Sequence, residues 1–297
     1  MLLAPLPALG IGVLVMQRSG VNPTIWGQQL ASGLVLITLC AGMRVALRPT
    51  WRSGSWAWAI VGGAALLLLT ATVAHPGVEG VRRWVSLGPL QLHAAFVALP
   101  ALLIVLCAVV RRESVGSATW LFPCAAGTAA GVLVLQPDAS QASAFAVAVA
   151  VVLLQRGRAY MSDWAAGGIV VGSALLAWSR PDPLEAVPHV EGIVGLAATL
   201  GAEWLIASAL ALALLPLPFI SVAVRRREQR PEGFSLAAYF GIVCVTPFVG
   251  PYPVPVLGYG LSPILGYFAA LGWIILSDGT ANTEADSPTG AHRSHAA

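Results

Sequence analysis

Residues 55–74 read SWAWAIVGGAALLLLTATVA, an apolar run without a charged side chain. A helix of about 20 residues crosses the hydrocarbon core of a bilayer, so this run predicts one complete transmembrane span. Backbone polar groups in lipid must be satisfied within the segment, so such a span must be helical. Similar runs on both sides predict nine more spans, near residues 2–16, 27–43, 90–110, 117–135, 140–155, 164–179, 203–224, 234–250 and 256–276.

The composition of the whole chain agrees with this reading. Of its 297 residues, 57% are hydrophobic and only 10% are charged, whereas soluble domains carry about 25% charged residues. The chain starts MLLAPLPALGIGVLVM, which lacks the basic region and cleavage site of a signal peptide, so we read it as a short first span. The four cysteines lie in apolar runs without CxxC spacing and indicate buried free thiols. The predicted fold class is an all-α polytopic membrane protein with about ten transmembrane helices.

The basic residues set the orientation, and all 16 of them are arginines. With ten spans and the N-terminus inside, twelve arginines fall on the cytoplasmic side and only Arg18, Arg82, Arg83 and Arg180 on the outer side. Cytoplasmic loops of membrane proteins are enriched in arginine, so both termini are expected in the cytoplasm of a bacterial inner membrane. We expect a transmembrane domain over residues 1–277 and a disordered cytoplasmic tail over 278–297.

Arg82 and Arg83 break this charge rule, in the predicted outer loop HPGVEGVRRWVSLGPLQ. Guanidinium groups match phosphate oxygens with two parallel hydrogen bonds, so this pair is a candidate for binding an anionic lipid headgroup. The alternative is an arginine pair that reaches ordinary lipid phosphates at the membrane surface.

Other outer loops carry acidic side chains and a histidine. The loop LQPDASQ contains Asp138, and the longest outer loop, SRPDPLEAVPHVEGIVG, contains Asp182, Glu185, His189 and Glu191. A carboxylate at the membrane surface can act as a general base or bind a cation. The alternative is a solvated loop with scattered charges.

The last outer loop reads FVGPYPVPVLGYGLSPILGY. Its prolines and glycines prevent a continuous helix. Irregular backbone at membrane depth is tolerated only inside the protein or beside a cavity, so we expect a broken segment beside a cavity here.

Four of these segments together resemble the SEDS family (shape, elongation, division and sporulation) of RodA- and FtsW-like membrane proteins. GVRRWVSLGPLQL is similar to the family's GARRWI-LGP-L segment, and LQPD is similar to its QPD motif. EAVPHVEGIVG resembles the family's EAHTDFIFA loop, and VPVLGYGLS resembles its LPFISYGGS loop. All four occur in the family's order and in the outer loops it requires, over nearly the whole chain.

The family polymerises peptidoglycan glycan strands from lipid II, an undecaprenyl-diphosphate-linked sugar, together with a transpeptidase (class B penicillin-binding protein). The resemblance therefore implies a glycosyltransferase of cell-wall synthesis in division or elongation. It implies that Glu191, at the family's aspartate position, is the general base or a ligand of a divalent cation. The residues that match the family's motifs and would bind the substrate are Arg82, Arg83, Trp84, Asp138, His189, Tyr259, Gly260 and Ser262.

The chain departs from the family where QPSE-x-x-K is replaced by HAAFVAL. His93 stands for the glutamine, Phe96 for the glutamate and Leu99 for the lysine, while Leu261 replaces a glycine of the last motif and Pro263 follows its serine. The loss of a charged pair leaves catalysis open. Two other hypotheses therefore remain: a non-catalytic scaffold or lipid-linked-sugar binding protein of a division or elongation complex, and a lipid flippase, which the scarcity of charge within the spans disfavours.

Overall fold

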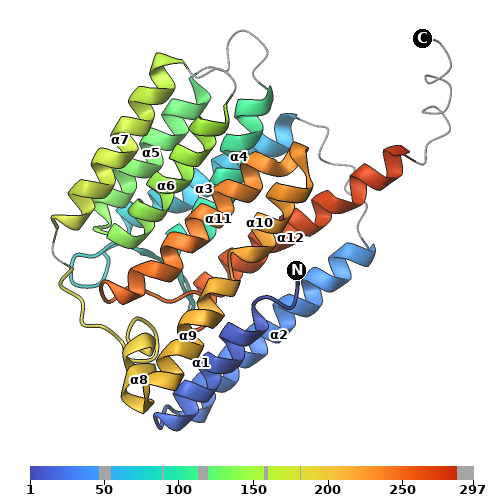
Figure 1. Cartoon of the computed structure of the whole chain (residues 1–297). Helices are drawn as coiled ribbons and strands as arrows, with labels where there is room; N and C mark the ends of the chain where they lie inside the picture. Colours follow the sequence, from blue (N-terminus) through green and yellow to red (C-terminus); the bar gives the residue numbers. More distant parts are fainter. Residues whose placement is uncertain (47–54, 89, 113–119, 157–159, 181, 286–297) are drawn as a thin grey trace.

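The computed structural model describes residues 1–46, 55–88, 90–112, 120–156, 160–180 and 182–285. Twelve α-helices and one β-hairpin form most of this part of the chain (Figure 1). The helices are α1 (Leu6–Arg18), α2 (Pro23–Ala46), α3 (Ser55–Ala74), α4 (Ala94–Arg112), α5 (Leu121–Leu135), α6 (Ala139–Gln155), α7 (Met161–Trp178), α8 (Ile193–Leu200), α9 (Ala202–Leu214), α10 (Leu217–Arg225), α11 (Arg230–Val245) and α12 (Leu261–Ala285).

These helices confirm the predicted all-α polytopic membrane fold. The ten predicted spans correspond to α1 through α7, to α9 and α10 together, to α11 and to α12. Within the described residues, four spans are long and apolar enough to cross a membrane: 23–43, 56–74, 94–111 and 202–225. Four shorter apolar helices accompany them: Leu6–Arg18, Leu121–Leu135, Ala139–Gln155 and Leu261–Leu276.

The fourth span starts later than predicted, because residues 90–93 form a strand. β1 (Trp84–Leu87) pairs antiparallel with β2 (Leu90–His93), with Trp84 opposite His93 and Val85 opposite Leu92. Apolar and polar residues alternate in LQLH, which is the period of a strand, and the prediction of a span from residue 90 is therefore wrong at its start.

The eighth span is divided at Pro216 into α9 and α10. Proline removes a backbone donor within a helix, so a carbonyl near the break needs another partner. The hydroxyl of Tyr267 on α12 donates a hydrogen bond of 3.0 Å to the carbonyl of Leu215.

The structure adds α8 in the segment that was predicted to be an outer loop, and α12 continues to Ala285, beyond the expected boundary at residue 277. Residues 286–297 of the expected tail lie outside the described residues.

Close packing of small residues holds the last helix and the last loop in place. A side chain at Gly266 of α12 would collide with the backbone of Phe96 on α4, and one at Gly12 of α1 would collide with the backbone of Leu257. Such glycines let membrane helices and backbone approach closely.

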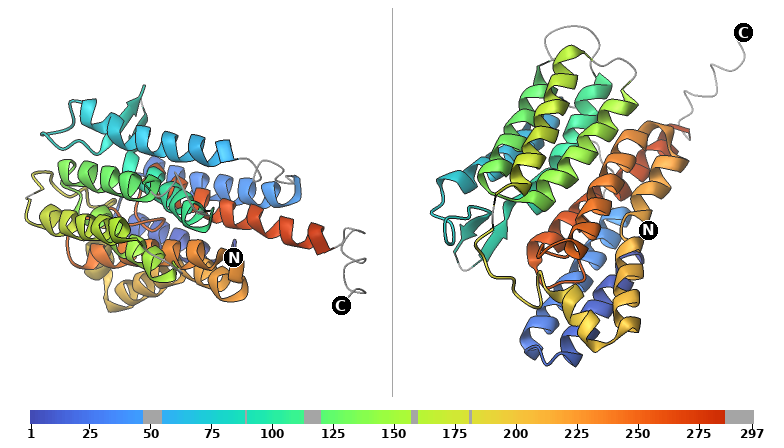
Figure 2. Two further views of the ribbon diagram at one scale, coloured as in Figure 1. Left: turned by 90° about the horizontal axis from the view of Figure 1, so that it is seen from above. Right: turned by 60° about the vertical axis from the view of Figure 1, so that its left-hand side comes forward.

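The β-hairpin, the turn between α5 and α6, the segment from α7 to α8 and the segment from α11 to α12 lie at one end of the bundle (Figures 1 and 2). We call this end the hairpin end. It contains all four segments that resemble the SEDS motifs.

Candidate functional site

Arg83 points into the protein and joins three segments of the hairpin end. Its side chain is 6% exposed. The guanidinium donates to the backbone carbonyls of Gln136 (3.1 Å) and Pro137 (2.6 Å), and its Nη1 lies 2.7 Å from Oδ2 of Asp182. Its Nε is 4.0 Å from Oδ2 of Asp138. The guanidinium of Arg83 is thus fully engaged by protein groups, and it connects the hairpin with the turn between α5 and α6 and with the segment from α7 to α8.

Arg82 points the other way and is exposed. Its Nη1 donates a hydrogen bond of 2.8 Å to the carbonyl of Val73, at the end of α3. Successive residues of an extended chain face opposite sides, which explains why the two neighbours differ. Of the two arginines, Arg82 is the one whose guanidinium is accessible from outside.

Asp138 begins α6 and is buried, with 2% of its surface exposed. Its Oδ1 accepts from the backbone N–H of Gln141, which is the usual contact of a helix N-cap. Burial alone would raise the pKa of Asp138, but contact with His93 and the positive charge of Arg83 outweigh burial and lower this pKa below its ordinary value. The carboxylate is therefore ionised at neutral pH.

His93 is the site residue that the sequence analysis treated only as a departure from the family. It ends β2, and Nε2 of its ring lies 3.3 Å from Oδ2 of Asp138. Its backbone N–H donates a hydrogen bond of 2.8 Å to Oγ of Ser262 at the start of α12. The ring also packs edge to face on Trp84 and Phe96, at centroid distances of 5.6 and 5.0 Å.

Gln28 and Gln29 of α2, which the sequence analysis did not single out, hold the last loop through hydrogen bonds. Nε2 of Gln29 donates to the carbonyls of Val256 and Gly258, both at 2.7 Å, and its Oε1 accepts from Gly260. Val256 has a φ of +64°, which is strained for a β-branched residue and is found mostly where surrounding contacts impose it. Polar residues inside an apolar span were the available signal.

His189, Glu191 and Tyr259 form the second part of the site. The His189 carbonyl accepts a hydrogen bond of 2.8 Å from the N–H of Tyr259, and their rings lie 5.8 Å apart between centroids. The hydroxyl of Tyr259 donates to Oε1 of Gln28 at 2.8 Å. Oε2 of Glu191 accepts from the backbone N–H of Val187 at 3.0 Å, within its own turn. Partial burial lowers the pKa of His189, although the charge of Glu191 opposes this, so the ring is neutral at neutral pH.

The hairpin end therefore brings most of the sequence-predicted residues other than Arg82 into two groups. Arg83, Trp84, Asp138 and Ser262 meet around His93. His189 and Tyr259 meet where the segment from α7 to α8 contacts the segment from α11 to α12, and the charge of Glu191 acts on the His189 ring. Among the described residues, no group of three or more His, Cys, Asp or Glu side chains could hold a metal ion.

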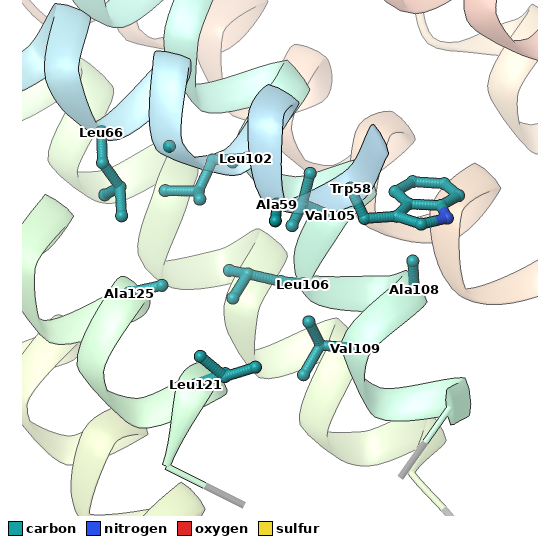
Figure 3. Close-up of a pocket in the computed structure, with 12 residues that line it drawn as sticks. Trp58, Ala59, Leu66, Leu102, Val105, Leu106, Ala108, Val109, Leu121 and Ala125 are labelled. Atoms are coloured by element: carbon teal, nitrogen blue, oxygen red, sulfur yellow. The ribbon is translucent and has the colours of Figure 1, made fainter. Parts of the chain in front are cut away.

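A cavity of about 390 Å³ lies elsewhere, between α3, α4 and α5 (Figure 3). It is lined near the start of α3 by Trp58 and near the end of α4 by Val109, so it reaches toward the end of the bundle opposite the hairpin. Its lining contains no charged side chain, and it therefore offers nothing that would bind a phosphate.

Comparison with known proteins supplies the fold but no match by sequence. No protein-family model and no curated protein matches the chain. Its structure is similar to that of the rod shape determining protein RodA of Thermus thermophilus, with a TM-score of 0.68 and 22% identity over 92% of this chain and 93% of RodA. The chain has a RodA-like fold. A point mutant of the same RodA gives a TM-score of 0.71 at 22% identity, over 92% and 94% of the two chains.

A further similar structure comes from a peptidoglycan synthase complex that coordinates polymerization and crosslinking. It matches with a TM-score of 0.68 and 22% identity, over 92% of this chain and 95% of the other. The resemblance to the SEDS family is thereby confirmed at the level of the RodA-like fold, and a multi-pass membrane protein of this type is expected in the bacterial inner membrane.

Proposed function

We propose that this protein is a distant SEDS member that binds an undecaprenyl-diphosphate-linked sugar at the outer leaflet and polymerises glycan from it. The observation that supports this most is the meeting of four segments, distant in sequence, at the hairpin end. Each segment carries one of the motifs that resemble SEDS motifs, and backbone and side-chain contacts of Arg83, His93 and Tyr259 connect them.

Each group of residues would have its own part in the reaction. Glycosyl transfer requires a base near the acceptor hydroxyl and positive charge on the leaving diphosphate. Glu191 would be the base, or the ligand of a divalent cation, and its charge acts on the neighbouring His189. Arg82 would contact the diphosphate, and Arg83 would hold the loop that presents Arg82.

Purified protein in liposomes with lipid II would test the proposal. Glycan polymer should form with the wild-type chain and not with an Arg82→Ala variant that inserts equally well. The similar peptidoglycan synthase complex combines polymerization and crosslinking, so we also propose a transpeptidase as the partner of this chain.

One observation favours the scaffold alternative. At the two positions where the family carries a glutamate and a lysine, this chain has Phe96 and Leu99, which are buried with 1% and 0% of their surface exposed. These side chains belong to the apolar core and offer no charge to a substrate. If the protein is a scaffold, the purified wild-type chain should not polymerise lipid II. A variant that weakens partner binding should nevertheless impair growth.

We infer the orientation from the arginine distribution, and it gives the first prediction. Reporter fusions after Arg112 and Arg227 should read as cytoplasmic, and fusions after Pro137 and Pro183 should read as outer, because arginine is retained on the cytoplasmic side. Alkaline phosphatase and green fluorescent protein fusions report the two sides independently. A reversed pattern would put the hairpin end on the wrong leaflet for the proposed substrate.

The second prediction separates the two neighbouring arginines. Arg82→Lys should lower polymer formation about ten- to a hundredfold, because an ammonium cannot make the two parallel hydrogen bonds of a guanidinium to phosphate. The melting temperature should stay unchanged, since Arg82 is exposed. Complementation of a deletion strain gives the cellular readout. Full rescue by Arg82→Lys would remove the diphosphate role.

A further inference from the structure

His93 lies where three segments of the hairpin end meet. Its backbone connects the hairpin to Ser262 at the start of α12, and its ring connects the hairpin to Asp138 at the start of α6. The ring is confined between Trp84 and Phe96, and the residue is 5% exposed. A substrate does not reach this ring, so any influence of His93 on chemistry must act through the residues that it holds.

The contact between His93 and Asp138 brings two buried polar atoms together. Nε2 of His93 lies 3.3 Å from Oδ2 of Asp138, and neither atom makes a hydrogen bond of standard geometry to any described residue. A carboxylate oxygen only accepts hydrogen bonds, and an imidazole N–H donates them. Leaving either atom unsatisfied in a buried site is costly, so an N–H at Nε2 directed at Oδ2 is the favourable arrangement of this contact.

Arg83 does not replace this donor. Its Nη1 lies 2.7 Å from Asp182, whereas its Nε is 4.0 Å from Asp138. The other titratable groups facing the pair are Tyr239 of α11 and Tyr252 of the last loop, both of which feel the charge of Asp138. A buried carboxylate needs close donors, and at 3.3 Å from Oδ2 the ring of His93 is closer than the Arg83 guanidinium.

We propose that His93 is a positioning residue, which fastens the hairpin to the start of α6 through its ring and to Ser262 through its backbone. Arg82 lies just before β1, so the ring contact and the backbone contact of His93 together place Arg82 relative to Asp138 and Ser262. Its effect on polymerisation rests on the proposed function, whereas its effect on the hairpin does not. A neutral glutamine, which the resembling family has here, keeps a side-chain donor.

Two substitutions separate the donor from the ring. His93→Gln keeps an N–H that can reach Asp138, and His93→Phe keeps an aromatic ring against Trp84 and Phe96 but has no donor. Amide hydrogen exchange of β1 and β2 in the full-length protein, without any substrate, measures how firmly the hairpin is held. We expect exchange to be about ten- to a hundredfold faster in His93→Phe and nearly unchanged in His93→Gln.

Equal exchange in wild type and His93→Phe would overturn the proposal. Faster exchange in His93→Gln than in His93→Phe would also overturn it and would indicate ring packing instead. Equal acceleration in both variants would overturn it as well, because His93→Gln keeps the donor. If His93→Phe fails to insert, Asp138→Ser serves, because a serine hydroxyl can still cap α6 but is too short to reach His93. Normal protection of the hairpin in that variant would also overturn the proposal.

Polymerisation of lipid II by the same variants then tests the consequence. A misplacement of about 1 Å can cost about 10²-fold in rate, so His93→Phe should lower kcat by about that factor with little change in KM, and His93→Gln should restore it. If exchange follows the prediction but the wild type makes no polymer, the positioning contact stands and the proposed reaction is wrong. If the wild type is active and exchange does not respond, the positioning role is wrong.

Discussion

Glu191→Gln should abolish glycan polymerisation, with a loss of about 10²–10⁴-fold, while the protein remains inserted and expressed. A general base or a cation ligand must be ionised, and this substitution removes only the charge. The side-chain oxygen that accepts from the N–H of Val187 is retained in glutamine, so the turn that carries residue 191 should persist. Polymer formed from lipid II by purified protein, corrected for the amount inserted, is the measurement.

Two other variants make this result interpretable. Glu185 lies in the same loop and is exposed, so Glu185→Gln should be nearly neutral and controls for loss of charge in the loop. Glu191→Asp keeps the charge and restores the residue of the resembling family, so it should retain partial activity. If Glu191→Gln supports normal growth and wall synthesis, the enzyme hypothesis should be abandoned in favour of the scaffold.

The fold was predictable because lipid imposes a simple rule on the chain. A run such as residues 55–74 has no soluble alternative, and the structure has α3 over this same range. The sequence analysis missed the β-hairpin because Leu90 and Leu92 adjoin the apolar run of α4 and were counted with it. Four residues of alternating polarity are too few to separate a strand from the start of a span.

The site was predictable in its segments but not in its contacts. Arg82 and Arg83 are identical in type and adjacent, and only the conformation of the hairpin makes one exposed and the other buried. His93 contacts Ser262, which is 169 residues away, and Gln29 contacts Gly258, which is 229 residues away. No local pattern encodes such partners, so residues that act through them were read as departures or passed over.

The buried state of Arg83 leads to the second large effect. Arg83→Met removes the charge at similar side-chain length and leaves Asp138 and Asp182 without their shared guanidinium, together with two backbone carbonyls that lose a donor. Breaking a buried ion pair from one side costs about 3–5 kcal/mol, because the remaining charge is uncompensated. Arg82→Met is the matched control: it loses one exposed hydrogen bond to the Val73 carbonyl, so its cost should stay at about 1 kcal/mol or less.

The chain contains its own reporters for this measurement. Cys40, Cys107 and Cys244 are buried free thiols, and Cys124 is exposed. In a Cys124→Ser background, a thiol-reactive dye therefore reports unfolding in detergent as the three buried thiols become accessible. Arg83→Met should melt at a clearly lower temperature, by on the order of 10 °C, whereas Arg82→Met should melt like the parent. Equal melting temperatures for the two variants would contradict the structural role of Arg83, and a low melting temperature for Arg82→Met would mean that its loss of activity cannot be assigned to substrate binding.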